Sequence, residues 1–218
     1  MARSYLRYIE KEDAYFAACQ PGTPKNTPLE SAVLEEAITW LCRDGATILD
    51  FGCGSGGLSF PCVFHGARSV LGIDLSLEAI RFAGACGQTL PQCRFIHGSV
   101  EVLQSLSLES FDGVILSNIL DNLYPEDALE VLSQCVRLLK PGGKALIKLN
   151  PHLTAGEIAQ WAVTEIEEDL LDDGLLLWNK PDEHWLSLLN WHFSLVRQED
   201  VYFSEYHQHN RLFLCEKT

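Results

Sequence analysis

The chain is short of basic residues, and it lacks both a long apolar run and a closely spaced pair of cysteines. Its 218 residues include 16 Lys and Arg against 30 Asp and Glu, a formal net charge of −14. Nucleic-acid binding needs a basic patch that neutralises phosphates, so we expect no nucleic-acid partner. No apolar run approaches the roughly 18 residues of a membrane span, and the first residues lack a signal-peptide core. We therefore expect a cytoplasmic protein without a membrane partner.

The eight cysteines form no C-x-x-C pair and have no matching histidine spacing, so neither a metal site nor a disulfide framework is predicted. Most of them lie inside apolar runs, which is typical of buried reduced thiols. The sequence also lacks internal repeats and low-complexity segments. Its length and its 47% hydrophobic content indicate one globular domain over residues 1–218.

The most informative stretch is ILDFGCGSGG, from Ile48 to Gly57. A short apolar run that ends in Asp50 is typical of a buried parallel strand. The glycines behind it allow a tight turn and a close approach of the backbone to a ligand. A helix that follows such a turn directs its unpaired N–H groups and the positive end of its dipole toward that space. The stretch therefore predicts a site for a nucleotide-like ligand.

The glycine spacing alone leaves two cofactors open, because Gly52-x-Gly54-x-x-Gly57 also fits the dinucleotide fingerprint. Two acids favour the other interpretation. Asp50 stands where it would repel a pyrophosphate but could receive a cation. Asp74 ends the next apolar run, VLGID, and could bind both ribose hydroxyls.

With these two motifs the sequence resembles the class I S-adenosylmethionine-dependent methyltransferases, and in particular members that methylate small molecules. The resemblance continues through FDGVILSN (111–118) and RLLKPGGKALIKL (137–149), and it covers about residues 46–150. It implies an α/β, doubly wound, seven-stranded and mostly parallel sheet with an antiparallel C-terminal hairpin. The expected strands beyond the first motif are 69–74, 94–97, 111–117 and 144–149, with a hairpin of 193–203 and 211–216.

Outside the motifs we expect several helices. Residues 4–19 form an amphipathic helix that either packs on the main body or acts as a lid, and the proline-rich residues 20–28 form an extended connector. Residues 29–218 then make the catalytic core. Its first helix is capped by Thr27 and a capping box with Glu30, and it ends at Gly45. Further helices are expected to start at Ser76 and to cover residues 125–139, 154–171 and 182–192.

The resemblance also implies roles for residues at the carboxyl ends of the strands, where open α/β sheets bind ligands. The backbone from Gly52 to Gly56, with Cys53 and Gly54, approaches the methionine part of S-adenosyl-L-methionine, and Asp50 orients the turn or the amino group. Asp74 takes the ribose, and Leu75 lies against the adenine face. The expected contacts to the adenine edge and at the end of the fourth strand come from Ser99, Val100 and Ser117.

The methyl acceptor is less determined. The N-P-P-Y signature of base-amino methyltransferases is absent, and SNIL stands in its place. The candidates beside the acceptor are Asn118, Asp121, Asn122 and His152, although a structural role suits each of them as well. His207 and His209 are expected on the surface, away from the crevice. We expect a small-molecule acceptor; O-, N- or C-methylation and the oligomeric state stay open. The alternatives are a non-catalytic S-adenosylmethionine-binding partner protein and an NAD-dependent dehydrogenase.

Overall fold

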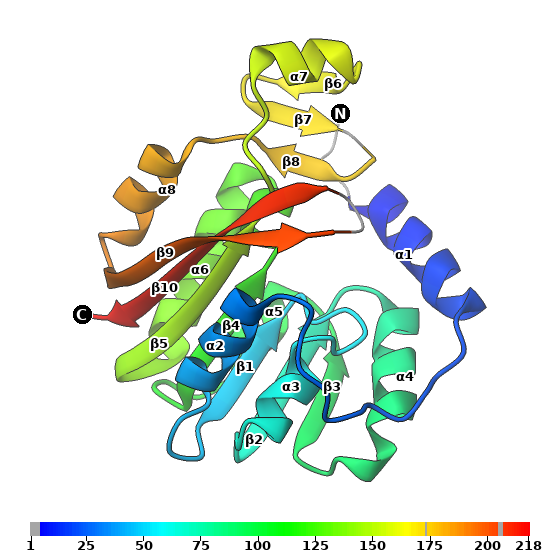
Figure 1. Ribbon diagram of the computed structural model, residues 1–218, viewed down its shortest axis with the longest axis vertical. Helices are drawn as coiled ribbons and strands as arrows, with labels where there is room; N and C mark the ends of the chain where they lie inside the picture. The colour runs from blue at the N-terminus through cyan, green and yellow to red at the C-terminus, as the bar shows by residue number, and fades with distance from the viewer. Residues whose placement is uncertain (1–4, 173, 205–206) are drawn as a thin grey trace.

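The computed structural model describes residues 5–172, 174–204 and 207–218. A seven-stranded sheet runs through the molecule, in the order β3-β2-β1-β4-β5-β10-β9, and helices cover both of its faces (Figure 1). Its strands are β1 (Thr47–Phe51), β2 (Ser69–Asp74), β3 (Cys93–His97), β4 (Phe111–Ser117), β5 (Leu139–Leu149), β9 (Phe193–Phe203) and β10 (Gln208–Lys217). The predicted fold class is confirmed.

Strands β1 to β5 are parallel, and the order of the sheet reverses at β1. This strand pairs with β2 on one side and with β4 on the other. The two halves of the sheet therefore diverge at the carboxyl end of β1, where a crevice forms in doubly wound folds. The glycine turn follows β1 directly, so it lies at this point.

The last two strands close the sheet as an antiparallel hairpin, as predicted. β10 pairs with β5 and with β9, and Phe213 lies opposite Ile147 of β5. Residues 205 and 206 of the predicted hairpin turn lie outside the described residues. Because β10 runs opposite to β5, its beginning lies beside the end of β5 and brings Asn210 and Arg211 there.

The core forms on both faces of the sheet. One cluster joins α5 (Val100–Ser105), α6 (Pro125–Leu138) and α8 (Asp182–Leu189) to the strands, with Trp185 fully buried. The other joins α2 (Ala32–Leu41) and α3 (Ser59–Phe64) to the opposite face. α4 (Leu77–Cys86) packs on β3 and begins at Ser76, whose hydroxyl accepts a hydrogen bond from Ala79 N, as predicted.

The first helix of the core begins four residues later than predicted. Its N-cap is Ser31, whose hydroxyl accepts from Leu34 N, so the prediction of Thr27 as the cap with Glu30 in a capping box is wrong. Glu35 explains the difference, because its carboxylate accepts from Leu29 N and thereby holds the preceding residues outside the helix.

The prediction of one helix over residues 154–171 is also wrong. Helix α7 covers only Ala155–Gln160 and ends in a left-handed residue, Ala162, at φ 52°. Val163 N then bonds back to Ile158 O, and the two side chains pack in one apolar cluster, which is a Schellman stop. Such a stop usually carries glycine, so the alanine concealed it in the sequence.

A second, three-stranded antiparallel sheet follows α7, in the order β6-β7-β8. Its strands are β6 (Thr164–Glu167), β7 (Leu170–Asp172) and β8 (Leu176–Trp178). The acidic residues that were predicted on a helix lie on β6, which is exposed along its length, and the turn into β7. This small sheet and α7 lie together beyond the end of the main sheet (Figure 1), so the segment builds a cover over the carboxyl ends of the strands.

Helix α1 (Leu6–Ala18) lies beside α4 and buries none of its own residues completely (Figure 1). The predicted start at Ser4 lies outside the described residues. Polar contacts fix the helix to the body: Arg7 pairs with Asp172, and Asp13 accepts from Ser76. Aromatic contacts add to these polar ones, because Tyr8 packs against the main core cluster and Phe16 contacts Phe82 of α4. Within the described ranges no helix has the length and apolar character needed to cross a bilayer.

Candidate active site

The glycine turn after β1 is built by left-handed backbone. Gly52 has φ 74° and Gly54 has φ 51°, which side chains with a Cβ rarely adopt. A Cβ on Gly52 would also lie 2.9 Å from Ile119 Cδ1, whereas a Cβ on Gly54 would meet no atom within 4 Å. Gly52 is therefore required for packing as well as for conformation, and the backbone at Gly54 faces open space.

Asp74 connects this turn to the end of β2. One carboxylate oxygen accepts from Gly54 N at 2.8 Å, and the other accepts from Ser76 N at 2.8 Å. Burial raises the pKa of Asp74, and the two backbone hydrogen bonds oppose that rise. The side chain thus holds the turn in place and also lines the crevice beside it.

The crevice has two adjoining parts, with cavity volumes of ≈ 290 Å³ and ≈ 260 Å³. Both parts are lined by Gly52, Asp74, Leu75 and Ile119. Ser99 and Val100 line the first part, and Gly54 lines the second. Six of the ten residues predicted to hold the cofactor therefore surround one space: Gly52, Gly54, Asp74, Leu75, Ser99 and Val100.

The other four lie behind or beside that space. Asp50 is 2% exposed and accepts a hydrogen bond from Ser59 of α3 at 2.6 Å. Burial raises the pKa of Asp50 to about 7. The structure therefore places Asp50 as an anchor for α3 behind the turn and not on the crevice wall. Cys53 is buried, and neither Gly56 nor Ser117 lines the crevice.

Helix α1 and its N-cap residue, Tyr5, supply crevice residues that the sequence left unassigned. Tyr5 lines both parts, and its hydroxyl donates to Asp127 and accepts from Tyr124 N. Tyr8 and Glu12 line the second part. The N-terminal segment thus packs on the body beside the crevice, and its role as a lid stays a prediction.

The ionisable side chains that line the crevice are acidic. Five carboxylate side chains line its two parts: Glu12, Asp74, Glu101, Asp127 and Glu130. Among the lining residues that the structure describes, none is Lys, Arg or His. Burial, followed by the nearby Asp74, raises the pKa of Glu12. The space therefore favours a ligand with positive charge and disfavours an anion.

Of the candidates beside the acceptor, Asn118 and Asn122 line the crevice, whereas Asp121 and His152 do not. Asp121 is fully buried and accepts from Asn150 N at 2.6 Å, and burial raises its pKa to about 6. His152 is exposed. These positions argue against catalysis by either, because neither side chain lines the crevice.

Four asparagine amides form a chain along this end of the sheet. Asn210 donates to Asn118, which donates to Asn150, which donates to Asn122. Asn122 Nδ2 then donates to the carbonyl oxygen of Leu176 in β8. A carbonyl can only accept, so this last bond fixes the direction of every amide in the chain. Sequence reasoning placed Asn150 at a strand end beside the crevice without giving it a role, and it missed Asn210, which only the antiparallel pairing of β10 with β5 brings there.

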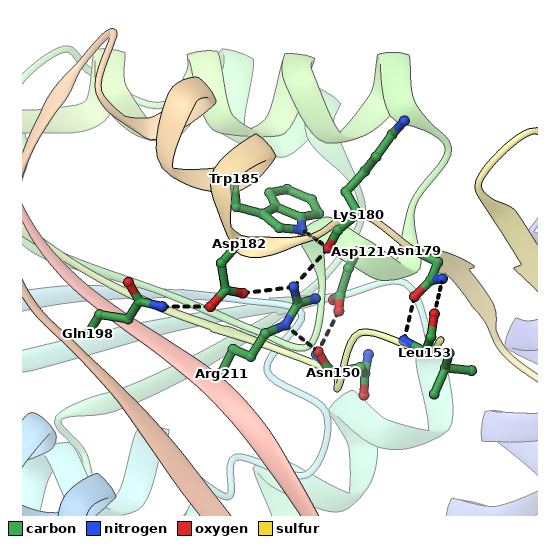
Figure 2. A network of polar contacts seen from close by, with 9 residues as sticks. All are labelled: Asp121, Asn150, Leu153, Asn179, Lys180, Asp182, Trp185, Gln198 and Arg211. Carbon is green, nitrogen blue, oxygen red and sulfur yellow. Dashed lines mark hydrogen bonds and ion pairs between the residues drawn. The ribbon is translucent and has the colours of Figure 1, made fainter. Parts of the chain in front are cut away.

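A second network of polar contacts, centred on Arg211 of β10, supports the same end of the sheet (Figure 2). Arg211 donates from Nε to Asn150 O at 2.8 Å and from Nη1 to Lys180 O and to Asp182. Asn179 exchanges two hydrogen bonds with the backbone of Leu153. The buried guanidinium thus ties the end of β5, β10 and the segment that leads into α8 to one another.

Beyond Asn122 lies a second hollow of ≈ 590 Å³, which shares Asn122 and Leu175 with the crevice. The residues that line it come from the strand ends, α7, the small sheet and the β9–β10 turn. They include His207 and His209. The expectation that these histidines are exposed is met, but they border a hollow that adjoins the crevice. In the described part of the chain no group of His, Cys, Asp and Glu is placed to hold a metal ion.

The architecture is that of the class I S-adenosylmethionine-dependent methyltransferases. The crystal structure of 1,6-didemethyltoxoflavin-N1-methyltransferase from Burkholderia thailandensis, with 1,6-didemethyltoxoflavin and S-adenosylhomocysteine bound, superposes with a TM-score of 0.66 at 21% identity. The match covers 87% of this chain and 80% of that one. The [4+2]-cyclase SpnF superposes with a TM-score of 0.70 at 17% identity, over 98% and 94% of the two chains. At these identities the likeness establishes the fold.

Sequence comparison finds the same class. Residues 48–143 match the family model described as a methyltransferase domain. A ubiquinone biosynthesis O-methyltransferase of Xanthomonas oryzae pv. oryzae (strain PXO99A) is 38% identical over 104 residues, which are 47% of this chain and 42% of the relative. The chain thus spans less than half the length of this relative. These matches confirm the resemblance that the two acidic motifs predicted.

Proposed function

We propose that the protein is an S-adenosylmethionine-dependent methyltransferase that acts on a small molecule. The observation that carries the proposal is the charge of the crevice: five lining carboxylates with no cationic side chain among its described lining residues. S-adenosylmethionine carries a positively charged sulfonium, which such a space attracts. The pyrophosphate of NAD would meet the same carboxylates without a compensating cation, so a dehydrogenase is disfavoured.

The residues of the crevice fit this cofactor part by part. The backbone at Gly54 faces open space, so a ligand can lie directly against the turn. Asp74 can accept hydrogen bonds from the ribose hydroxyls, since a carboxylate has more acceptor sites than its two backbone partners use. Ser99 makes no capping hydrogen bond with its own helix, which leaves its hydroxyl for the adenine edge.

The bound cofactor would supply an electrophilic methyl group, and the work of the protein is to hold an acceptor in line with it. Alignment of two reactants supplies a large share of the rate in such a displacement. Asn118 and Asn122 line the crevice, Asn122 also borders the second hollow, and the amide chain fixes the orientation of both. Their roles are to position an acceptor atom, since amides neither gain nor lose a proton near neutral pH.

A second candidate is a protein that binds the cofactor without transferring its methyl group. The likeness to a [4+2]-cyclase supports this candidate, because that protein has the same fold and is named for a reaction other than methyl transfer. The B. thailandensis neighbour and the O-methyltransferase relative favour methyl transfer to small molecules.

Two measurements test the proposal in sequence. In thermal unfolding, S-adenosylmethionine and S-adenosylhomocysteine should raise the melting temperature, because a ligand that binds only the folded state stabilises it, and NAD should not. Release of S-adenosylhomocysteine is then assayed with a panel of small metabolites. Stabilisation by NAD alone would refute the cofactor assignment. Stabilisation without turnover on any acceptor would favour the second candidate.

A further inference from the structure

The second hollow is positioned to hold a molecule next to the crevice. It shares Asn122 and Leu175 with the crevice. A ligand in the hollow would therefore lie next to a ligand in the crevice. A volume of ≈ 590 Å³ lies within the range of small-molecule sites, about 300–1,000 Å³. Much of its lining comes from the α7 region, the small sheet and residues 207–209, all outside the region of the methyltransferase family match.

One side of the hollow is apolar. It is formed by Leu153, Leu175, Leu177 and Trp161. Trp161 is 57% exposed although it is a large apolar side chain, and it borders the hollow at the end of α7. An exposed indole beside leucine side chains is a surface on which a flat apolar ligand gains contact area.

The other side offers mainly hydrogen-bond donors. His207 and His209 line it, and a histidine ring carries at least one N–H in either protonation state. Nδ1 of His207 contacts the Tyr202 hydroxyl at 3.1 Å, which leaves its Nε2 uncommitted, and the His209 ring packs against the Tyr202 ring. Asn122 adds an amide whose second N–H has no assigned partner among the described residues.

The one carboxylate among the described residues that line the hollow, that of Glu157, already accepts hydrogen bonds from Thr154. Glu157 accepts from the Thr154 backbone N–H and hydroxyl, and so closes the capping box of α7. Its negative charge is partly satisfied there, whereas Nε2 of His207 and the second N–H of Asn122 have no assigned partner among the described residues. The hollow therefore differs from the acidic crevice, and it suits a ligand group that accepts hydrogen bonds.

On these grounds, and on the basis of the proposed function, we propose that the second hollow is the methyl-acceptor subsite for a small carboxylic acid with a flat apolar body. The apolar body lies on Trp161 and Leu177, and the carboxylate accepts hydrogen bonds from His207 and His209. The atom to be methylated then lies toward Asn122, at the border with the crevice.

The test uses two probes that share an apolar body and differ in their charge, 3-phenylpropanoate and its primary amide, 3-phenylpropanamide. Binding of each is titrated to the full chain in the presence of saturating S-adenosylhomocysteine. The acid should bind about ten-fold tighter than the amide, the factor that one hydrogen bond to a charged group contributes. Equal affinities, or no binding of either probe to the cofactor-loaded protein, would overturn the proposal.

Two variants, each with a matched control, test whether the probes bind in the hollow. His209→Phe keeps a ring against Tyr202 but removes the N–H donors, so it should reduce the preference for the acid. Trp161→Ala should weaken both probes. His192→Phe and Trp191→Ala change exposed residues that do not line the hollow and should alter neither affinity. If the controls act as strongly as the hollow variants, the proposal fails. S-adenosylhomocysteine binding is measured on every variant and on the unaltered protein. If the unaltered protein does not bind it, the proposed function is contradicted instead.

Discussion

The carboxylate of Asp74 accepts a hydrogen bond from the backbone N–H of Gly54 at 2.8 Å, and this bond joins the ends of two neighbouring strands. Asp74 ends β2, and Gly54 belongs to the turn after β1. Both residues also line the crevice, so the side chain that holds the turn borders the space proposed for the cofactor. Substitutions at these two positions should therefore affect stability and affinity together.

We expect Asp74→Ala to weaken S-adenosylhomocysteine binding by about ten- to a hundred-fold, because hydrogen bonds to a carboxylate contribute roughly 1.5–3 kcal/mol each. The melting temperature should fall as well, since Gly54 N and Ser76 N lose their acceptor. Calorimetry and thermal unfolding on the same variant measure both effects.

Asp112→Ala is the matched control. Asp112 also accepts from a backbone N–H, that of Thr47 at 2.9 Å, but it lies at the opposite end of the sheet. This variant should lose stability and keep its affinity. An Asp74 variant with unchanged affinity and a lowered melting point would contradict the ribose role.

Gly54→Ala should lower both stability and affinity. Its left-handed φ strains an alanine by about 1 kcal/mol, and the new Cβ would enter the open space where the ligand lies. Gly66→Ala is matched to it, because Gly66 has φ 91°, also has open space around a Cβ, and does not line the crevice. If both variants bind S-adenosylhomocysteine with the affinity of the unaltered protein, the ligand does not approach the turn at Gly54.

Glu12→Gln should reduce the preference of the site for a charged ligand. Glu12 lines the same part of the crevice as Asp74, and its carboxylate favours a cation there. We expect the affinity for S-adenosylmethionine to fall several-fold more than the affinity for S-adenosylhomocysteine, which lacks the sulfonium charge. Glu10→Gln alters an exposed residue of the same helix and should leave the ratio unchanged. An equal loss for both ligands would exclude the electrostatic role.

Deletion of residues 1–19 should leave a folded protein with weaker cofactor binding. Helix α1 contains no fully buried residue, and of the described residues in the deleted segment only Tyr5 and Tyr8 pack against the main core cluster, so most of the core packing remains. The crevice would lose the wall formed by Tyr5, Tyr8 and Glu12. Circular dichroism checks the fold and calorimetry the affinity, and an unchanged affinity would show that the helix does not cover the ligand.

The free energy of unfolding should depend on pH through Asp50. Burial raises its pKa in the folded protein to about 7, whereas an unfolded aspartate titrates near 3.9. The folded state therefore holds the extra proton between these values, and stability falls as pH rises from about 4 to about 7, by up to roughly 4 kcal/mol.

Asp50→Asn cannot ionise, so its stability should fall less over the same range. Buried Asp121, with a pKa of about 6, contributes in the same direction and leaves a residual slope. Urea unfolding at several pH values compares the two proteins. Parallel pH profiles would show that Asp50 does not titrate between its unfolded and folded values.

The sequence by itself determined the parallel half of the main sheet and the C-terminal hairpin. Strands 69–74 and 111–117 were predicted to the residue, because each is an apolar run bounded by turn residues. The same local patterns located Asp74 and the glycine turn, since strand ends in this fold meet at one edge. For such elements the local pattern of apolar and turn residues is sufficient to predict the structure.

Only the tertiary structure decided what covers that edge. The stop at Ala162 and the exposed strand β6 have no local signal, because a left-handed alanine and a strand without buried residues break the patterns that sequences reveal. The place of Asp50 was likewise beyond the sequence, since its contact with Ser59 depends on how α3 packs against β1. The amide chain from Asn210 to Leu176 joins residues that are far apart in sequence, and only the pairing of β10 with β5 and the folding of the small sheet bring them together.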